Sequence, residues 1–450
     1  MSEQNKLFTF LEQTVMEPLG KLAQYKVVRA ITAAGMASIP FTIVGSMFLV
    51  FNILPLTFTF LTDFFDATVN KITSLYMLGF HASMGTLALY FNIVIGYELT
   101  KIYAEEEGLD LTPINGALLS MFALLMTLPQ LVFSEGAVTP LHNLEEGATI
   151  VSGWAVGGSG LVRLGTSGIF TAIIMAVLAV HLYRLCVVKR WVVKMPDSVP
   201  LGVSRGFTAL IPAFVVAFAV ILINGFFLMF NTDIFNVVAI PFGFVSNLTN
   251  SWLGLMVIYF LVQALWIVGI HGANIIFPII TPITLANMTL NAQGAHIPLA
   301  GEFSNMFVTM GGSGATLGLT LYIAYWAKSE QLRVLGKVAV APAIFNINEP
   351  IIFGLPMIYN PAMAIPFFLA PMVSATIAYF AINLQLIRPV VAQMPWPSPV
   401  GIGAFIGTVG DWKAAVVAII CAFAAFLVYY PFINAYDKKL YQQEQEKAQT

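Results

Sequence analysis

A single carboxylate, Glu349, lies in a part of the chain that is otherwise almost free of charge. Between Val338 and Gly410 its only charged companion is Arg388. A carboxylate in an apolar, membrane-embedded setting is costly unless it forms hydrogen bonds, so such a residue indicates a functional site. The flanking Asn346 and Asn348 and the proline that follows Glu349 interrupt a regular helix, because short amides compete for backbone bonds and proline lacks an N–H. This turn therefore gathers amides and a carboxylate, groups that suit the hydroxyls of a sugar.

A second polar segment, from Trp266 to Asn274, lies inside a stretch without any Asp, Glu, Lys or Arg, Ile234 to Gly301. His271 precedes a glycine and follows Gly269 by two residues, which permits an irregular turn and close backbone approach. Taken alone, such a histidine is more typical of a core residue with a backbone partner. The presence of Glu349 in the same half of the chain favours a ligand contact, with the tryptophan as a flat apolar face for a sugar ring.

Three further motifs carry weaker signals. The run Gly311-Gly312-Ser313-Gly314 looks like a phosphate-binding loop, but no strand precedes it and no lysine follows closely, so it predicts tight packing or exposed backbone donors at a helix break. The segment Trp396-Pro397-Ser398-Pro399 predicts either a cavity-lining stretch or a simple exterior loop. The run Glu105-Glu106-Glu107 is most simply a solvated face.

Composition establishes the class of the protein. The chain has 450 residues, of which 58% are hydrophobic and only 9% charged, against about 25% charged in an average soluble domain. It is therefore an all-α polytopic membrane protein. Apolar windows of bilayer length predict about ten spanning helices plus re-entrant pieces, with clear windows near 30–53, 74–97, 115–133, 166–183, 209–231, 252–270, 304–327, 361–387 and 414–436.

Other segments are expected to be interrupted or to lie at the membrane surface. The stretches 272–290 and 338–358 are broken by prolines, which is tolerated at membrane depth only where the backbone is buried or lines a cavity. Residues 1–29 lack the short apolar core of a cleavable signal peptide. Their apolar stripe predicts an amphipathic interfacial helix, with a soluble cap as the alternative.

Basic residues predict the topology. They concentrate in the N-terminal arm, in the segment after the fourth span and in the C-terminal tail (Lys6, Lys21, Lys26, Arg29; Arg184, Lys189, Arg190, Lys194, Arg205; Lys438, Lys439, Lys447), so both termini are expected in the cytoplasm. The expected division is a scaffold half at 30–186, a basic linker at 187–205, a C-terminal half at 206–436 and a tail at 437–450. A net charge of −2 argues against nucleic-acid binding.

The two cysteines, Cys186 and Cys421, are far apart and lie in or beside apolar spans. Their spacing fits neither a disulfide nor a metal site, so packing roles are expected. We expect no metal and no cofactor.

Together these motifs resemble the IIC membrane component of the bacterial phosphoenolpyruvate-dependent sugar phosphotransferase system, in its lactose/cellobiose/diacetylchitobiose family. The resemblance covers the whole chain and is most specific at Asn-Glu-Pro, residues 348–350. It implies a multi-pass protein of the bacterial cytoplasmic membrane, surrounded by lipid, that forms a homodimer of ten-helix protomers. It also implies an N-terminal dimerisation half and a C-terminal sugar-binding half with re-entrant hairpins.

The resemblance also implies roles for individual residues. Glu349 and His271 would contact sugar hydroxyls near the phosphorylated position. Trp266 and Trp396 would supply stacking surface, with Trp412 as an alternative to Trp396. The amides of the same segments complete the expected substrate-binding set (Asn274, Asn346, Asn348).

The implied mechanism is group translocation of a β-linked disaccharide. A phosphocysteine on a separate IIB protein, itself supplied by IIA, would phosphorylate a 6-hydroxyl at the cytoplasmic side. Glu349 would either accept the hydroxyl proton or only orient the sugar. The residues alone also permit a proton-coupled sugar symporter in which Glu349 and His271 form a proton relay. An intramembrane enzyme lacks support, because there is no metal-ligand pair and no nucleophile–base arrangement.

Overall fold

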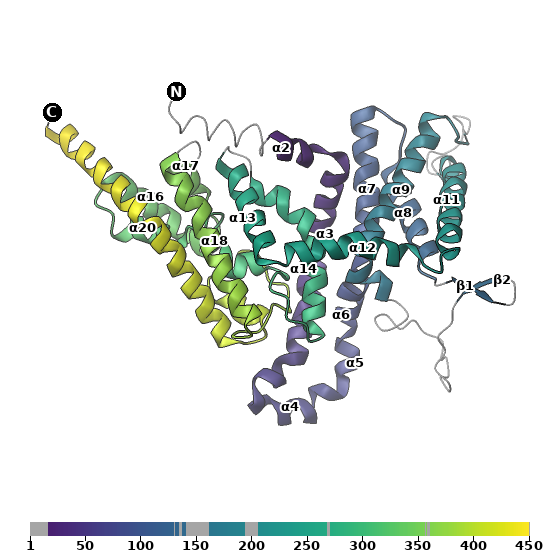
Figure 1. Cartoon of the computed structure of the whole chain (residues 1–450), viewed down its shortest axis with the longest axis horizontal. Coiled ribbons are helices and arrows are strands. Elements are labelled where there is room, and N and C mark those ends of the chain that lie inside the picture. Colours follow the sequence, from purple (N-terminus) through teal and green to yellow (C-terminus); the bar gives the residue numbers. More distant parts are fainter. Residues whose placement is uncertain are drawn as a thin grey trace. The chain divides into compact units, whose positions relative to one another are not determined.

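The computed structural model describes residues 17–129, 131–134, 137–140, 162–193, 206–267, 271–355, 357 and 361–449 (Figure 1). Helices dominate these residues, which confirms the all-α class. The described part also holds one antiparallel pair of short strands, β1 (Leu131–Ser134) and β2 (Ala137–Pro140). Most of the expected N-terminal amphipathic segment and most of the expected basic linker lie outside the described residues.

The α-helices of the structure keep the labels of Figure 1. They are α2 (Glu17–Gln24), α3 (Lys26–Thr57), α4 (Thr62–Ala67), α5 (Thr73–Tyr76), α6 (Leu78–Ser83), α7 (Leu87–Glu107), α8 (Pro113–Thr127), α9 (Ile169–Val188), α11 (Leu210–Leu228), α12 (Ile234–Thr249), α13 (Trp252–Ile267), α14 (Gly272–Ala292), α15 (Leu317–Tyr325), α16 (Glu330–Ile344), α17 (Glu349–Gly354), α18 (Pro361–Asn383), α19 (Ile402–Gly407) and α20 (Trp412–Gln449). A π-helical turn, η7, covers Ser304–Val308. Short 3₁₀ turns occur at Thr59–Leu61, Val69–Ile72, Met84–Thr86, Val162–Leu164 and Thr166–Gly168.

Seven of the described helical stretches are long and apolar enough to cross a membrane. An eighth span results if α12 and α13, which meet at an angle of 81°, count as one broken span. The expected interruption of 338–358 is present, because α16 ends at Ile344 and α17 begins at Glu349.

Two expectations about helix continuity were wrong. Residues 304–327 do not form one span, because a glycine-rich stretch with positive φ angles separates η7 from α15. Conversely, α14 runs unbroken through Pro278 and Pro282. A proline costs one backbone hydrogen bond and kinks a membrane helix, and neighbouring groups can satisfy the freed carbonyl.

Contacts within the chain group it into two compact units. Unit 1 comprises Met1–Ala23, Ser46–Met77 and Ser246–Thr450, and unit 2 comprises Gln24–Gly45 and Leu78–Val245. Helix α11 belongs to unit 2, where it packs against α8 and α9. In the expected division, this helix lies in the C-terminal half, residues 206–436. The functional division into a dimerisation half and a sugar-binding half remains a prediction.

Helices α7, α8 and α9 form the centre of unit 2. Gly96 and Gly116 let α7 and α8 approach closely: a Cβ on Gly96 would lie 2.8 Å from the Gly116 carbonyl oxygen. Such small residues at a crossing are typical of membrane helix packing, where close van der Waals contact replaces the hydrophobic effect. The Asn92 Nδ2 of α7 donates to the Ala172 carbonyl of α9 at 2.9 Å, which ties the two helices together, while its Oδ1 has no partner among the described residues.

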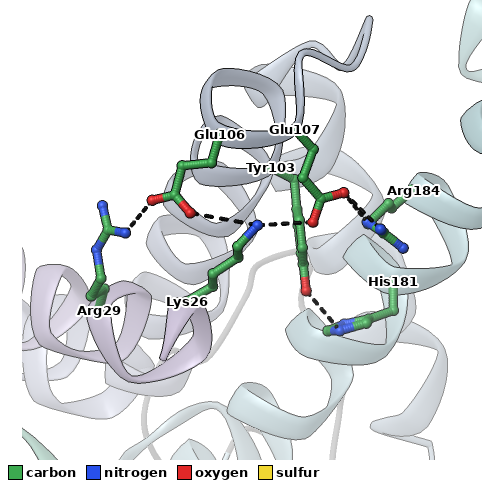
Figure 2. Close-up of polar contacts among 7 residues, drawn as sticks. All are labelled: Lys26, Arg29, Tyr103, Glu106, Glu107, His181 and Arg184. Atoms are coloured by element: carbon green, nitrogen blue, oxygen red, sulfur yellow. Dashed lines mark hydrogen bonds and ion pairs between the residues drawn. The ribbon is translucent and has the colours of Figure 1, made fainter. Parts of the chain in front are cut away.

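The end of α7 carries an ionic network (Figure 2). Glu105, Glu106 and Glu107 are all exposed, as expected for a solvated face, and two of them also form ion pairs. The Glu107 carboxylate pairs with Lys26 at 2.8 Å and with Arg184 at 2.6 Å. Glu106 pairs with Arg29 and, at 3.5 Å, with Lys26. Three elements of unit 2, the start of α3, the end of α7 and α9, are thereby joined, with each pair partly exposed and individually weak.

In unit 1, α18 packs on both α13 and α20. The far end of α20 also caps the start of α16. The buried Asp437 accepts hydrogen bonds from the backbone N–H groups of Lys328 and Ser329 at 2.9 Å each. Glu444, two turns further along α20, accepts from the Ser329 hydroxyl at 2.6 Å and from the Glu330 N–H at 3.0 Å. Carboxylates at a helix N-terminus satisfy free N–H groups and complement the helix dipole.

Asp437→Ala is expected to lower the thermal stability of the protein. The substitution leaves the buried Ser329 N–H without its partner, at about 1–3 kcal/mol, and also removes the acceptor of the part-buried Lys328 N–H. The apparent melting temperature should therefore drop clearly. The effect is measured by heating the detergent-purified protein and monitoring the loss of its monodisperse gel-filtration peak. Lys438→Ala, at the adjacent exposed position, is the control, and equal melting of the two variants would contradict the capping role.

Candidate functional site

His271 lies directly before the first residue of α14. This residue is the N-cap of α14, and its Nδ1 accepts a hydrogen bond from the Asn274 backbone N–H at 3.2 Å. An Nδ1 that accepts requires the proton of the neutral ring to lie on Nε2, so Nε2–H is the donor that His271 can offer to a ligand. Gly272 allows the start of α14 to pack closely on α13, because a Cβ there would lie 2.0 Å from the Val262 carbonyl oxygen.

The Trp266 ring lies beside this histidine. The two ring centroids are 4.4 Å apart with the planes tilted by 47°. The tryptophan is only 4% exposed, and its indole Nε1–H has no hydrogen-bond partner among the described residues. A buried donor left unpaired costs free energy, so this N–H is suited to bind a ligand oxygen.

Glu349 is the first residue of α17, and its side chain is exposed. No described residue donates a hydrogen bond to its carboxylate. Burial lowers the pKa of His271, while the Glu349 carboxylate and a backbone hydrogen bond oppose that shift. An electrostatic interaction therefore links the two residues that the charge pattern singled out, which come from segments far apart in the sequence.

Asn346 and Asn348 were expected to contact substrate, but in the structure their amides bind protein backbone. The Asn346 Oδ1 accepts from the Gly311 N–H at 2.9 Å, and its Nδ2 donates to the Trp396 carbonyl at 2.8 Å. The Asn348 Nδ2 donates to the Ser313 carbonyl at 2.5 Å. Both side chains are buried, so these bonds fix the Glu349 turn between two other loops.

The glycine-rich segment is a tightly packed chain reversal, in agreement with the first of its two expected uses. Gly311, Gly312 and Gly314 have φ angles of +80°, +95° and +87°, a region that favours glycine. A Cβ on Gly312 would lie 2.4 Å from the side-chain Cγ of Asn348. Only glycine therefore allows Asn348 to lie against this backbone.

Gly312→Ala is expected to reduce folded yield and thermal stability. An alanine at this φ adds backbone strain of about 1–3 kcal/mol, and the new methyl group displaces Asn348, which adds about 1–3 kcal/mol of overpacking. The measurement is the melting temperature of detergent-purified protein. Gly35→Ala, where a Cβ would meet no atom within 4 Å, should melt like the wild type, and equal behaviour of the two variants would show that the segment adapts freely.

The remaining expected site residues lie as follows. Trp396 is 47% exposed, and its carbonyl is held by Asn346 in the Glu349 turn. Trp412, the alternative, is 66% exposed at the start of α20. Asn274 has an exposed side chain in the first turn of α14. The structure thus links Trp396, through its backbone, to the segment that carries Glu349.

Sequence reasoning missed another carboxylate, Glu302, whose side chain is half-buried. Its two oxygens accept hydrogen bonds from the Gln393 amide at 2.6 Å and from the Asn305 amide at 2.5 Å. Burial raises the pKa of the Glu302 carboxyl, and these two amide bonds oppose the rise. Glu302 comes directly after the charge-free stretch that ends at Gly301, so the argument that selected Glu349 applies to it as well.

Metal and thiol chemistry have no visible site in the part of the chain that the structure describes. No group of three or more His, Cys, Asp or Glu side chains there is arranged to hold a metal ion. Cys186 and Cys421 are both fully buried and unpaired, and Cys421 lies against Ser374. Neither thiol is accessible as a nucleophile.

Comparison with known proteins identifies the family of the chain. The family described as "Phosphotransferase system, EIIC" matches residues 33–371. The chain is 34% identical to the cellobiose-specific EIIC component of Geobacillus stearothermophilus, over 98% of this chain and 96% of that protein. It is 29% identical to the lactose-specific EIICB component of Lactococcus lactis subsp. lactis, over 94% of this chain and 71% of that longer protein.

A solved structure is similar as well. The transporter ChbC, the IIC component from the N,N'-diacetylchitobiose-specific phosphotransferase system, superposes with a TM-score of 0.84 at 30% sequence identity. The match covers 97% of this chain and 99% of that one. On these grounds the chain belongs to the EIIC family of phosphotransferase systems, as the motifs had indicated, and is a membrane transport component of such a system.

Proposed function

We propose that this chain carries a β-linked disaccharide of the cellobiose, diacetylchitobiose or lactose class across the bacterial cytoplasmic membrane. The sugar is then phosphorylated at a 6-hydroxyl by a IIB protein, and both termini of the transporter lie in the cytoplasm. One observation carries the proposal: Trp266 and His271 lie side by side, and the indole N–H has no partner among the described residues. The Glu349 carboxylate interacts electrostatically with the same histidine.

These groups match the chemistry of a sugar. The indole face takes the apolar C–H side of a pyranose ring, while its Nε1–H and the Nε2–H of His271 donate to ring substituents. The Glu349 carboxylate accepts from hydroxyl groups, and a charge-assisted hydrogen bond is roughly twice as strong as a neutral one. Trp396 supplies further stacking surface from the loop that Asn346 holds in place.

Phosphoryl transfer requires a donor from outside this chain, because both of its cysteines are buried. In the proposed step, the S–P bond of a IIB phosphocysteine breaks and an O–P bond forms to the sugar 6-oxygen. The hydroxyl proton must leave at the same time. Glu349 either takes this proton or accepts a hydrogen bond that orients the hydroxyl. The longer lactose-specific relative, named EIICB, supports pairing with IIB, and IIA would recharge IIB.

Transport itself is proposed to follow from movement of a sugar-binding half relative to a scaffold half in a lipid-embedded homodimer. A sugar shifts such an equilibrium by its difference in affinity for the two states. Cysteine pairs placed between the halves should therefore cross-link in a sugar-dependent way. Constitutive cross-links that leave transport undiminished would contradict the movement.

Uptake by proteoliposomes tests the function. The expected result is exchange of unmodified disaccharide without a pH gradient, and trapping as sugar phosphate only when phosphorylated IIB is added. Uptake driven by a pH gradient alone would instead establish the proton-coupled symporter. A panel of labelled cellobiose, lactose and diacetylchitobiose in the same assay identifies the preferred sugar.

A further inference from the structure

Gln263 is a polar side chain without a partner in the middle of α13. It is completely buried, and neither its amide nitrogen nor its amide oxygen has a hydrogen-bond partner among the described residues. The surrounding helix is almost wholly apolar, with mostly Leu, Ile, Val, Phe and Met around it. Burying an amide without a hydrogen bond costs about 1–3 kcal/mol by mutational measures. A glutamine at this position therefore indicates a partner that the described residues do not supply.

The position of Gln263 on its helix relates it to the sugar site. Gln263 precedes Trp266 by three residues and follows Tyr259 by four, so the three side chains share one face of α13. At one end of this face lies the unpaired indole N–H beside His271. At the other end the Tyr259 hydroxyl is hydrogen-bonded to the Ser304 hydroxyl at 2.7 Å. Among the described residues, the polar group of Tyr259 therefore has a hydrogen-bond partner, whereas those of Gln263 and Trp266 have none.

We infer that Gln263 binds one hydroxyl group of the transported disaccharide and contributes to the choice of sugar. An amide offers a donor and an acceptor, and a sugar hydroxyl offers the same pair, so one hydroxyl can satisfy both amide atoms. Binding sites built to hydrogen-bond a hydroxyl discriminate strongly against analogues that lack it, because the protein groups are then left unpaired. This inference rests on the proposed function and adds a recognition residue to the same site.

The test compares Gln263→Leu with the wild type in binding a series of monodeoxy analogues of the preferred disaccharide. The variant should bind the intact sugar at least about tenfold more weakly, which is about 1.4 kcal/mol. One deoxy analogue should lose affinity against the wild type but bind the variant as well as the intact sugar does. Such loss of additivity reports direct coupling between the two groups. Gln331→Leu, with an exposed side chain, should bind every sugar like the wild type.

A purely structural glutamine, for instance one bound to an internal water, gives a different pattern. Gln263→Leu would then change the melting temperature of the sugar-free protein, and every deoxy analogue would lose the same factor in variant and wild type. That result overturns the role of Gln263 while leaving the proposed function intact. A wild-type protein that binds none of the three disaccharides overturns the proposed function, and this inference with it.

Discussion

Glu349→Gln will leave the protein folded and inserted but will weaken disaccharide binding by about 100-fold or more. The carboxylate has no donor among the described residues and is exposed, so the sugar-free fold does not depend on it. Each hydrogen bond from a hydroxyl to the charged group contributes about 1.5–3 kcal/mol, and the amide of glutamine replaces a charged acceptor by a neutral one. Isothermal titration with the preferred disaccharide measures the loss.

The matched control for this experiment is Glu330→Gln. Glu330 is also an exposed glutamate at the first position of a helix in the same unit, but it lies at the far end of α16 from Glu349. Its replacement should not change the affinity, and it should lower the melting temperature only slightly, because a carboxylate in the first turn of a helix contributes about 0.3–1 kcal/mol. If Glu349→Gln binds the sugar normally, the assignment of the site is wrong, whatever the control does.

The fold class and two residues of the candidate site, Glu349 and His271, could be predicted from the sequence because both predictions depend on local composition. Apolar windows of bilayer length predict spanning helices without any knowledge of tertiary contacts. A carboxylate or histidine in such a setting is conspicuous for the same reason, so Glu349 and His271 could be selected before the structure was known. Glu302 would have met the same criterion.

Long-range contacts could not be predicted from local composition. Asp437 caps backbone N–H groups more than a hundred positions earlier in the chain, and no local pattern records that pairing. The prolines of α14 were expected to end a helix, but tertiary context can supply what the missing N–H removes. The glycine run showed that the chain must bend, but its partner, Asn348, became evident only from the packing.

The amides beside Glu349 illustrate the same limit. Their residue type predicts hydrogen bonds, but it does not say whether a sugar or the protein provides the partner. In the structure Asn346 joins two loops through three backbone groups, those of Gly311, Trp396 and Ser398. Its side chain has few bonds left for a ligand, since an amide forms at most four. We therefore propose that Asn346 positions the site and does not itself bind the sugar.

Asn346→Ala should consequently lower both stability and affinity, whereas Glu349→Gln lowers affinity alone. The substitution leaves the Gly311 N–H and two carbonyl groups without their partner, at about 1–3 kcal/mol for each group that stays buried and unpaired. Asn346 also has a φ of +62°, which asparagine tolerates better than alanine. We expect the melting temperature of the sugar-free protein to fall by several degrees and disaccharide binding to be lost.

Two companion variants separate the causes of that effect. Asn346→Gly keeps the backbone conformation accessible and removes the bonds, so it should still be destabilised and bind poorly. Asn346→Asp keeps the acceptor for the Gly311 N–H but loses both donors to the Trp396 loop, so stability should fall less than in the alanine variant while binding stays impaired through the displaced loop. If instead all three variants melt like the wild type and only binding is lost, Asn346 contacts the sugar directly, as its sequence context had predicted, and the bonds to the two loops contribute little to the fold.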